Sequence, residues 1–324
     1  MLIIKNNIAI ENFCYLSIIN IKQIKVNKIS IALHGGAGNI YKANFSKELE
    51  SAYNRSMDIA LQIGVKILAK GGSSLDAVEA TIVELENCPL FNAGKGSVYN
   101  AIGEHEMDAA IMCGKTLSAG AVAGVEQIKN PVTLARAVME KSNHVLLIGK
   151  GAVDFAILNK IELANEDYFF DEKRFQQWKL LQGKSTTQLD HASLNDKKFG
   201  TVGAVALDVH GNLAAATSTG GMTNKMQGRV GDSPIIGAGT YANNKTCAIS
   251  CTGHGEHFIK NVVAYDISCL MEYKSLSLHQ ACDFVVMNKL KAIGAEGGLI
   301  AIDAVGNIEM PYNTNYMFCM SYKS

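Results

Sequence analysis

The chain has 324 residues and a mass of 34.8 kDa, with 48% hydrophobic and 19% charged residues; such a chain buries roughly 75% of its unfolded surface, which predicts a compact globular protein. Thirty basic residues balance thirty acidic ones, so the net charge is zero. This balance excludes the basic surface that nucleic-acid-binding and membrane-surface proteins carry, and favours a small-molecule partner.

Eight cysteines show no C-x-x-C pair and no regular spacing, so we expect neither a zinc ribbon nor a disulfide framework but reduced thiols in a cytoplasm. At the N-terminus, residues 1–29 are rich in isoleucine, but Glu11, Asn12 and Asn20 interrupt the apolar run. The segment is too polar to span a membrane and is a poor signal peptide. We therefore expect residues 1–29 to be an extension outside the fold.

The first half of the chain alternates strands and helices. A strand at 31–33 runs into a glycine-rich turn at 34–38, and apolar residues at three/four spacing from Tyr53 predict a long amphipathic helix ending at Gly71. Ser73 or Ser74 caps a second helix, and a loop follows at 88–97. The remaining elements that we predict are strands at 107–112 and 120–125, a helix from Asn130-Pro131, a buried strand at 145–148 and a helix at 152–158.

The second half follows a charged segment. Between 160 and 198, 14 of 39 residues are Lys, Arg, Asp or Glu, which predicts a solvated, mobile connection over 160–199. After it we predict a buried strand at 202–206, hairpins at 205–213 and 300–308, and helices at 256–272 and 276–292, the second preceded by a serine that can cap it. This order of elements predicts an α/β/β/α sandwich.

Two charged residues stand out in the glycine-rich stretch from 201 to 252. The planar fork of Arg229 suits a carboxylate, and Asp232, three residues later, can accept from an ammonium group. Together they would bind an α-amino acid. The alternative is that Arg229 and Asp232 simply pair with each other.

No common signature of a nucleophile is present. The sequence has no G-x-S-x-G motif, and no histidine stands near an obvious Ser or Cys. A hydroxyl can also be activated by the α-amino group of its own residue at a chain start, whose pKa of about 7.7 to 8.0 suits this role. Cleavage between Gly200 and Thr201 would create such a start. The alternative is that Thr201 is an ordinary β-branched strand residue.

A resemblance to a known family decides between the alternatives for Arg229 and Asp232 and for Thr201, and seven motifs carry it. They are His34-Gly35-Gly36-Ala37-Gly38, Phe91-Asn92-Ala93-Gly94, residues 120–125 (GAVAGV), residues 200–206 (GTVGAVA), Ser218-Thr219-Gly220-Gly221, residues 228–234 (GRVGDSP) and residues 251–256 (CTGHGE). In order and approximate spacing the chain resembles the isoaspartyl peptidase/L-asparaginase family, the plant-type asparaginases among the N-terminal-nucleophile hydrolases, from about residue 29 to about residue 315.

The resemblance implies a precursor that cuts itself before Thr201. One product would be an α-subunit that ends at Gly200 and whose folded part is residues 30–200. The other would be a β-subunit of residues 201–324. The two subunits together would form one structural domain. Thr201 would be the nucleophile and its freed amino group the base. The resemblance also places Thr219, Thr252, Gly253 and Asn92 at the catalytic centre, and lines the substrate site with Arg229, Val230, Gly231, Asp232, Thr252, Gly253, His254 and Gly255.

The family's activity and assembly are implied in the same way. Such an enzyme cleaves isoaspartyl dipeptides and deamidates L-asparagine to L-aspartate and ammonia, without a catalytic cofactor. We expect a homodimer of αβ units, with the helix from Tyr53 and the helix from Glu256 offering apolar surface. No nucleic-acid or membrane partner is implied.

The resemblance further implies a structural sodium ion, held by backbone carbonyls of the loop after the second helix: Leu85, Glu86, Cys88, Phe91, Ala93 and Lys95. Two features depart from the family pattern here. Lys95 stands where an apolar residue is usual, and the C-terminus at 317–324 is short and lacks an expected arginine.

Three rival interpretations remain at this stage. A glycosylasparaginase-type amidase would have Asp, not Gly200, before the nucleophile. A nucleotide-binding protein would use the glycine-rich turns for phosphate, but Gly94-Lys95-Gly96-Ser97 lacks the P-loop frame. A zinc site at His254 and His257 has suitable spacing on one helix face but no third ligand in view.

Overall fold

The computed structural model describes residues 28–38, 46–183 and 200–324. The strands are β1 (Ser30–Gly38), β2 (Met107–Cys113), β3 (Ala119–Val125), β4 (Leu146–Ile148), β5 (Val202–Leu207), β6 (Leu213–Thr219), β7 (Thr240–Ala242), β8 (Cys247–Gly253), β9 (Gly297–Asp303), β10 (Ile308–Glu309) and β11 (Tyr316–Lys323). The helices are α1 (Lys47–Ala69), α2 (Ser74–Asn87), α3 (Pro131–Lys141), α4 (Gly149–Leu158), α5 (Glu166–Phe169), α6 (Glu172–Leu181), α7 (Gly255–Asn261), α8 (Val263–Lys274) and α9 (Leu278–Asp283). A 3-10 turn, Gly94–Gly96, follows α2 in the chain, and a π-helical segment, Phe284–Leu290, continues α9.

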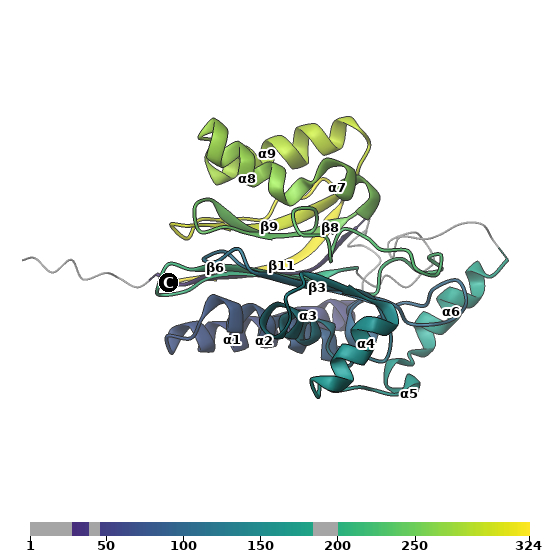
Figure 1. The fold of residues 1–324 in the computed structure, drawn as a ribbon. Helices are drawn as coiled ribbons and strands as arrows, with labels where there is room; N and C mark the ends of the chain where they lie inside the picture. Colours follow the sequence, from purple (N-terminus) through teal and green to yellow (C-terminus); the bar gives the residue numbers. More distant parts are fainter. Residues whose placement is uncertain (1–27, 39–45, 184–199) are drawn as a thin grey trace, which may run out of the picture.

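These strands form two sheets. The larger has the order β11-β1-β5-β6-β2-β3-β4 and is antiparallel except where β3 meets β4. The smaller has the order β10-β9-β8-β7. Figure 1 shows α1, α2 and α3 against the outer face of the larger sheet, and α8 and α9 against the outer face of the smaller one. The chain is therefore a mixed α/β protein.

The central strands of the larger sheet are buried on both faces. Along β5, Val202 and Ala204 pack into the apolar cluster under α1–α3, whereas Val205 packs into the cluster shared with the smaller sheet. This alternation follows the two-residue period of a strand. The start of β5 is thus fixed between two cores.

Several sequence predictions are confirmed. Ser73 caps α2 by accepting a hydrogen bond from the Asp76 amide at 3.1 Å, and Pro131 opens α3. The long first helix is present but begins at Lys47, six residues before Tyr53, because Ser46 caps it there. Both predicted hairpins form, as β5-β6 and as β9-β10.

Other predictions are wrong in detail. The helix predicted at 256–272 is two helices, because Val262 adopts a left-handed conformation with φ of 48° between α7 and α8. Ser277, inside the range predicted for the next helix, is its N-cap and forms a capping box with Gln280. The strand at 145–148 was expected to be buried, but β4 lies at the edge of its sheet with Leu146 and Ile148 exposed.

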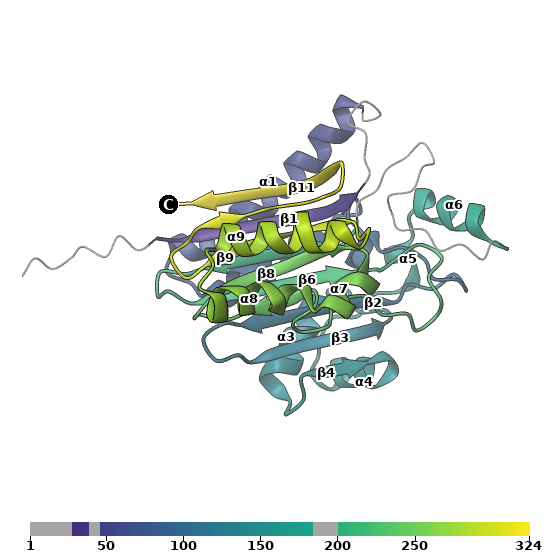
Figure 2. The ribbon, with the colours of Figure 1, turned by 90° about the horizontal axis from the view of Figure 1, so that it is seen from above.

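The charged segment is more ordered than predicted. Residues 166–181 form α5 and α6, with Asp171 capping α6 and Phe169 and Leu181 buried. Helix α6 was missed because its buried contacts are few and do not form a continuous stripe; Figure 2 shows it projecting from the end of the sheets. The rest of the predicted connection, 184–199, lies outside the described residues.

The predicted extension also lies mostly outside the described residues, which begin at Lys28. Ile29 belongs to the fold: it is buried, and its amide donates to Ser324 Oγ at 3.0 Å. At the other end of the fold, β11 is an edge strand and pairs with β1 up to Lys323. Across the described residues no helix has the length and apolar character that a membrane crossing demands.

Candidate active site

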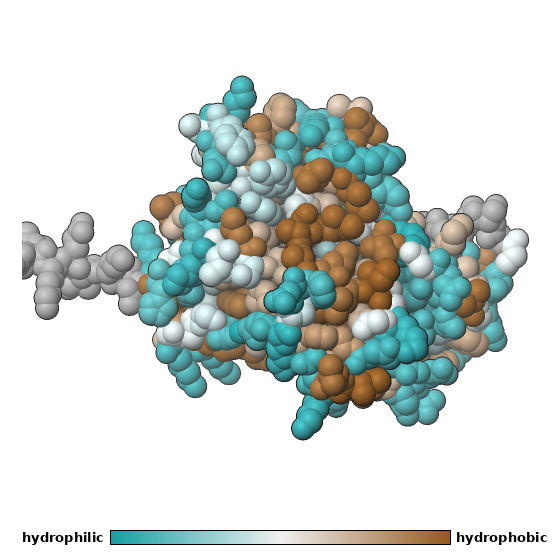
Figure 3. All heavy atoms as spheres, viewed as in Figure 1, coloured by the Kyte–Doolittle hydropathy of each residue, from teal (hydrophilic) through white to brown (hydrophobic). Residues whose placement is uncertain are grey.

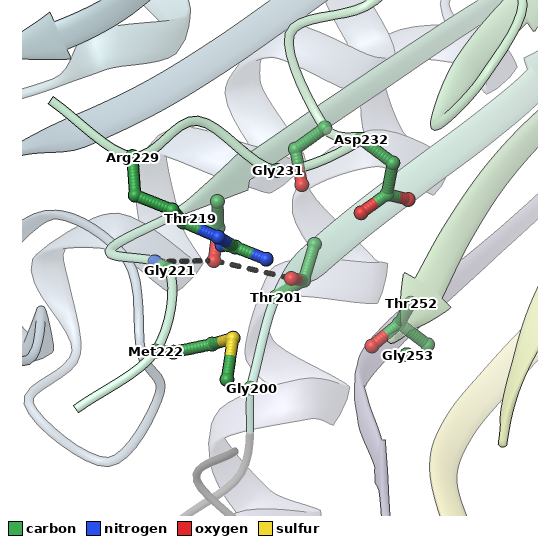
Figure 4. A pocket seen from close by; sticks show the side chains of 11 residues that line it. Gly200, Thr201, Thr219, Gly221, Met222, Arg229, Gly231, Asp232, Thr252 and Gly253 are labelled. Atoms are coloured by element: carbon green, nitrogen blue, oxygen red, sulfur yellow. Dashed lines mark hydrogen bonds between the residues drawn. The ribbon is translucent and has the colours of Figure 1, made fainter. Parts of the chain in front are cut away.

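The register of β5 and β6 brings two threonines together. Val202 pairs with Ser218, which sets Thr201 opposite Thr219 at the end of the strand pair. Thr201 Oγ1 donates to Thr219 Oγ1 at 3.1 Å, and Thr219 Oγ1 also accepts from the Gly221 amide at 3.0 Å (Figure 4). The hydroxyl of Thr201 is therefore oriented by a neighbour that is itself held in place.

Glycines make room for the backbone before Thr201. Gly36 has a φ of 105°, and a Cβ there would lie 2.6 Å from the Gly200 amide nitrogen. Because no real side chain tolerates that distance, only glycine lets β1 approach the Gly200-Thr201 bond so closely. The glycine-rich turn predicted at 34–38 is part of β1, with an irregularity in the pairing between His34 and Ala37.

His34 lies against the backbone of Thr201, and its imidazole is poorly suited to act as a base. Its side chain is fully buried, and burial lowers its pKa to about 3, although a hydrogen bond to the Thr201 backbone opposes that shift. Its Nε2 atom lies 3.0 Å from Ser250 Oγ. The imidazole is therefore neutral near pH 7 and too weakly basic to take a proton from a hydroxyl there.

A small pocket opens at Thr201. Its lining residues are Gly200, Thr201, Thr219, Gly221, Met222, Arg229, Gly231, Asp232, Ser233, Thr252 and Gly253. Figure 4 shows Arg229, Asp232 and Thr252 arranged around the Thr201 hydroxyl. The structure thus brings together most of the residues that the sequence suggested for the site, whereas Asn92, Val230, His254 and Gly255 do not line this pocket.

Asn92 supports the pocket from outside. Its Nδ2 donates to the Gly221 carbonyl at 2.7 Å, and its Oδ1 accepts from the Val98 amide at 3.0 Å. It ties the loop after α2 to the turn that contacts Thr219. Asn92 therefore contacts the residue whose amide donates to Thr219 Oγ1, and it does not line the pocket itself.

Arg229 and Asp232 do not form the mutual pair that we considered. Arg229 Nη2 makes its ion pair with Glu256 at 2.9 Å. Asp232 is buried, its Oδ2 has no hydrogen-bond partner, and burial raises its pKa to about 7 despite the opposing charge of Arg229. A buried acceptor in a pocket that also holds a guanidinium suits a zwitterionic ligand.

Thr252 and Gly253 close the other side of the pocket at the end of β8. Thr252 Oγ1 accepts from the Ala37 amide at 3.3 Å, which joins β8 to the turn in β1. Gly253 has a φ of 150°, and a Cβ there would lie 2.5 Å from the Glu296 carbonyl oxygen. The backbone here is held in a conformation that favours glycine.

Gly255 and His254 follow at the start of α7. A Cβ on Gly255 would lie 3.0 Å from Arg229 Nη2 and 3.1 Å from Asp232 Oδ1, so the glycine leaves space between these two groups. The rings of His254 and His257 are 6.0 Å apart. In the part of the chain that the structure describes, no group of three His, Cys, Asp or Glu side chains could hold a metal ion.

The loop after α2 is tightly wound. A Cβ on Gly94 would lie 2.5 Å from the Glu86 carbonyl oxygen, and one on Gly96 would overlap the carbonyl oxygen of Phe91. The amides of Gly96 and Ser97 already donate to the carbonyls of Ala93 and Gly94. They are not available to a phosphate group, which removes the support for a nucleotide-binding turn here.

Sequence reasoning missed Glu256 as a site residue, although its contact with Arg229 holds the guanidinium. It also missed Met222, which lines the pocket. Two hydrogen bonds that hold the loop of Arg229 in place were missed as well: the Glu106 side chain accepts from the Gly228 amide at 2.9 Å, and buried Lys225 donates to the Glu106 carbonyl at 2.7 Å. No local sequence signal connects these residues, because they come from separate elements.

Comparison with known proteins adds the family relation. A family model described as "Asparaginase" matches residues 27–324. The chain is 52% identical to the "Isoaspartyl peptidase" of Escherichia coli K12 over 296 residues, covering 90% of this chain and 92% of that protein. It is 44% identical to the "Isoaspartyl peptidase/L-asparaginase" of Homo sapiens over 286 residues, covering 87% of this chain and 89% of that protein.

Proposed function

The chain belongs to the asparaginase family, and on that premise we propose that it cuts itself before Thr201, cleaves isoaspartyl dipeptides and converts L-asparagine to L-aspartate and ammonia. The observation that carries this proposal is the hydrogen bond from Thr201 Oγ1 to Thr219 Oγ1 in a pocket that also holds Arg229 and Asp232. The fold is then the four-layer α/β/β/α sandwich of N-terminal-nucleophile hydrolases, which the face-to-face sheets and outer helices support.

Self-cleavage would supply the missing base. Once the bond to Gly200 is cut, the α-amino group of Thr201 sits on the nucleophile's own residue, and its ordinary pKa of about 7.7 to 8.0 lies near neutrality. The buried neighbour His34 has a pKa of about 3, so it does not compete for the proton. This contrast favours the amino group as the proton acceptor.

The reaction then follows from positioning. Arg229 holds the substrate α-carboxylate and Asp232 its ammonium group, so the side-chain carbonyl, one methylene from Cα, lies at Thr201. Thr201 Oγ attacks that carbonyl carbon and gives its proton to the amino group. The Thr252 hydroxyl and the Gly253 amide stabilise the oxyanion. Ammonia or an amino acid leaves with the proton, and water hydrolyses the ester to release L-aspartate.

The direct test is hydrolysis. We expect the purified protein to release L-aspartate from both L-asparagine and a β-aspartyl dipeptide, because both present the same α-carboxylate, ammonium and side-chain carbonyl. Chromatography of the free amino acids measures this release. No turnover of either substrate by fully cleaved protein would defeat the proposal.

We extend the proposal to a structural sodium ion in the loop after α2, held by the backbone carbonyls of Leu85, Glu86, Cys88, Phe91, Ala93 and Lys95. The tight winding of the loop, in which a Cβ on Gly94 or Gly96 would collide with the Glu86 or Phe91 carbonyl oxygen, keeps these carbonyls in one short segment, and carbonyl oxygens suit a hard cation. The side chain of Lys95, the departure from the family pattern, places its ammonium 5.2 Å from the centre of the Tyr168 ring. No catalytic role falls to the ion.

We also propose a cytoplasmic homodimer of αβ units. Buried Cys251 and Cys282 are free thiols with raised pKa values, as suits a reducing compartment.

For the dimer interface, Figure 3 shows apolar side chains gathered at the centre of one face, between α7 and β3. Exposed apolar residues on neighbouring elements are Leu146 and Ile148 of β4, together with Val262 and Tyr265. Such a patch suits a two-fold interface better than α1, whose apolar stripe is buried in its own core.

Light scattering on the cleaved protein tests the assembly. We expect a mass of about 70 kDa, twice the 34.8 kDa of one chain. Ile148→Glu places a charge on the patch, where the side chain is 65% exposed, and is expected to yield about 35 kDa units. Ile59→Glu on α1, 46% exposed, is the matched control and should leave the mass unchanged. A wild-type mass near 35 kDa at micromolar concentration would end the dimer proposal.

A further inference from the structure

Glu256 makes a two-point contact with the guanidinium group of Arg229. It lies in the first turn of α7, and its Oε1 atom accepts from Arg229 Nε and from Arg229 Nη2, both at 2.9 Å. The Arg229 side chain is only 16% exposed and that of Glu256 is 50% exposed. The contact therefore lies at the rim of the pocket, with the guanidinium on the inner side.

This contact determines which part of the guanidinium is left for a ligand. A guanidinium offers a carboxylate two bidentate edges, one formed by Nε and Nη2 and the other by Nη1 and Nη2. Glu256 occupies the first edge. Nη1 lies over the pocket, since Cβ atoms on the lining residues Gly221 and Gly231 would be 3.5 Å and 3.0 Å from it.

We propose that Glu256 is a positioning residue, which holds Arg229 so that its Nη1–Nη2 edge faces the α-carboxylate of the substrate. This inference rests on the proposed function, because it takes Arg229 as the carboxylate site. The length of the Glu256 side chain, its reach, matters here and not its charge, because the acceptor oxygen must extend from α7 to the edge of the guanidinium formed by Nε and Nη2. The negative charge of Glu256 by itself would only repel the incoming carboxylate.

The charge of Glu256 has a second, separable consequence. Burial is the main cause that raises the pKa of Asp232, and the charges of Glu256 and Asp108 raise it further, whereas a backbone hydrogen bond and the charge of Arg229 lower it. With a pKa of about 7, Asp232 loses its charge as the pH falls through neutrality. Binding of an ammonium group should weaken below that point, and removing the charge of Glu256 should shift the weakening to lower pH.

Two variants separate reach from charge. Glu256→Asp keeps the charge but is one methylene shorter, and we expect its KM for L-asparagine to rise about tenfold with a smaller change in kcat, since a hydrogen bond to a charged group is lost. Glu256→Gln keeps a carbonyl oxygen at the same reach, and we expect a KM within about twofold of the wild type at pH 8.5. A role in charge alone predicts the opposite order.

Glu140 provides a matched control. It accepts from Arg136 Nε at 2.7 Å on α3, with side chains 45% and 17% exposed, and takes no part in the pocket. Glu140→Asp should therefore leave the kinetics unchanged. Wild-type KM in Glu256→Asp, or equal impairment in Glu256→Gln and Glu256→Asp, would overturn the inference. Cleaved wild-type protein that turns over neither substrate would instead defeat the proposed function.

Binding of L-aspartate, measured by calorimetry on the cleaved protein, gives an independent readout. For the wild type we expect affinity to fall below about pH 7, as Asp232 gains a proton. In Glu256→Gln the same fall should occur at lower pH. An unshifted pH dependence in Glu256→Gln contradicts the coupling of the Glu256 charge to Asp232. If Glu256→Asp does not mature, the KM of Glu256→Gln at pH 8.5 decides on the positioning role: a rise of about tenfold, although this side chain keeps its reach, would overturn the inference.

Discussion

Thr201→Ala is expected to leave the chain whole and to abolish hydrolysis of L-asparagine, with a loss of about 10⁴-fold or more in kcat. The substitution removes the hydroxyl that bonds Thr219 Oγ1 at 3.1 Å, and with it both the attacking atom and the chance to free an α-amino group. Denaturing electrophoresis and a coupled ammonia assay measure the two effects.

Thr201→Ser is the matched control, because it keeps the hydroxyl and loses only a methyl group. We expect this variant to yield two chains and to retain measurable turnover. Wild-type activity in Thr201→Ala would show that another group is the nucleophile. Loss of cleavage together with full hydrolysis in Thr201→Ala would show that Thr201 is needed for self-cleavage but not for hydrolysis.

Arg229→Lys is expected to lower kcat/KM by about 1.5 to 3 kcal/mol, or roughly 10- to 150-fold. A lysine keeps the positive charge, but its single ammonium cannot bond Glu256 and present a two-donor edge to the substrate at the same time. Steady-state kinetics on L-asparagine and on an isoaspartyl dipeptide measure the loss.

Arg136→Lys serves as the control for Arg229→Lys, since Arg136 also bonds carboxylates at the surface but lies on α3, away from the pocket. It should leave the kinetics unaffected. Unchanged kcat/KM in Arg229→Lys on both substrates would remove Arg229 from the site.

Local signals predicted most elements of the fold. Ser73 caps α2 and Pro131 opens α3, because cap and first-turn preferences act over a few residues. The break at Val262 escaped prediction, since a β-branched residue with positive φ has no sequence signature. The exposure of Ile148 was also missed, because an exposed edge strand can have the same apolar composition as a buried central strand.

The site was predictable only in part. Residue chemistry alone suggested Arg229 and Asp232, while Thr201 gained weight only through the resemblance of seven motifs. The register that sets Thr201 opposite Thr219 depends on pairing between distant strands. Glu256 was quoted within a motif but given no role, because its contact with Arg229 joins α7 to a loop 27 residues earlier in the chain.

The intact mass of the purified protein shows directly whether the chain cuts itself before Thr201. We expect two chains, the smaller beginning at Thr201 with a free amino group. That result would provide both the nucleophile and its base on one residue. A protein that stays a single chain and is nonetheless fully active would contradict it.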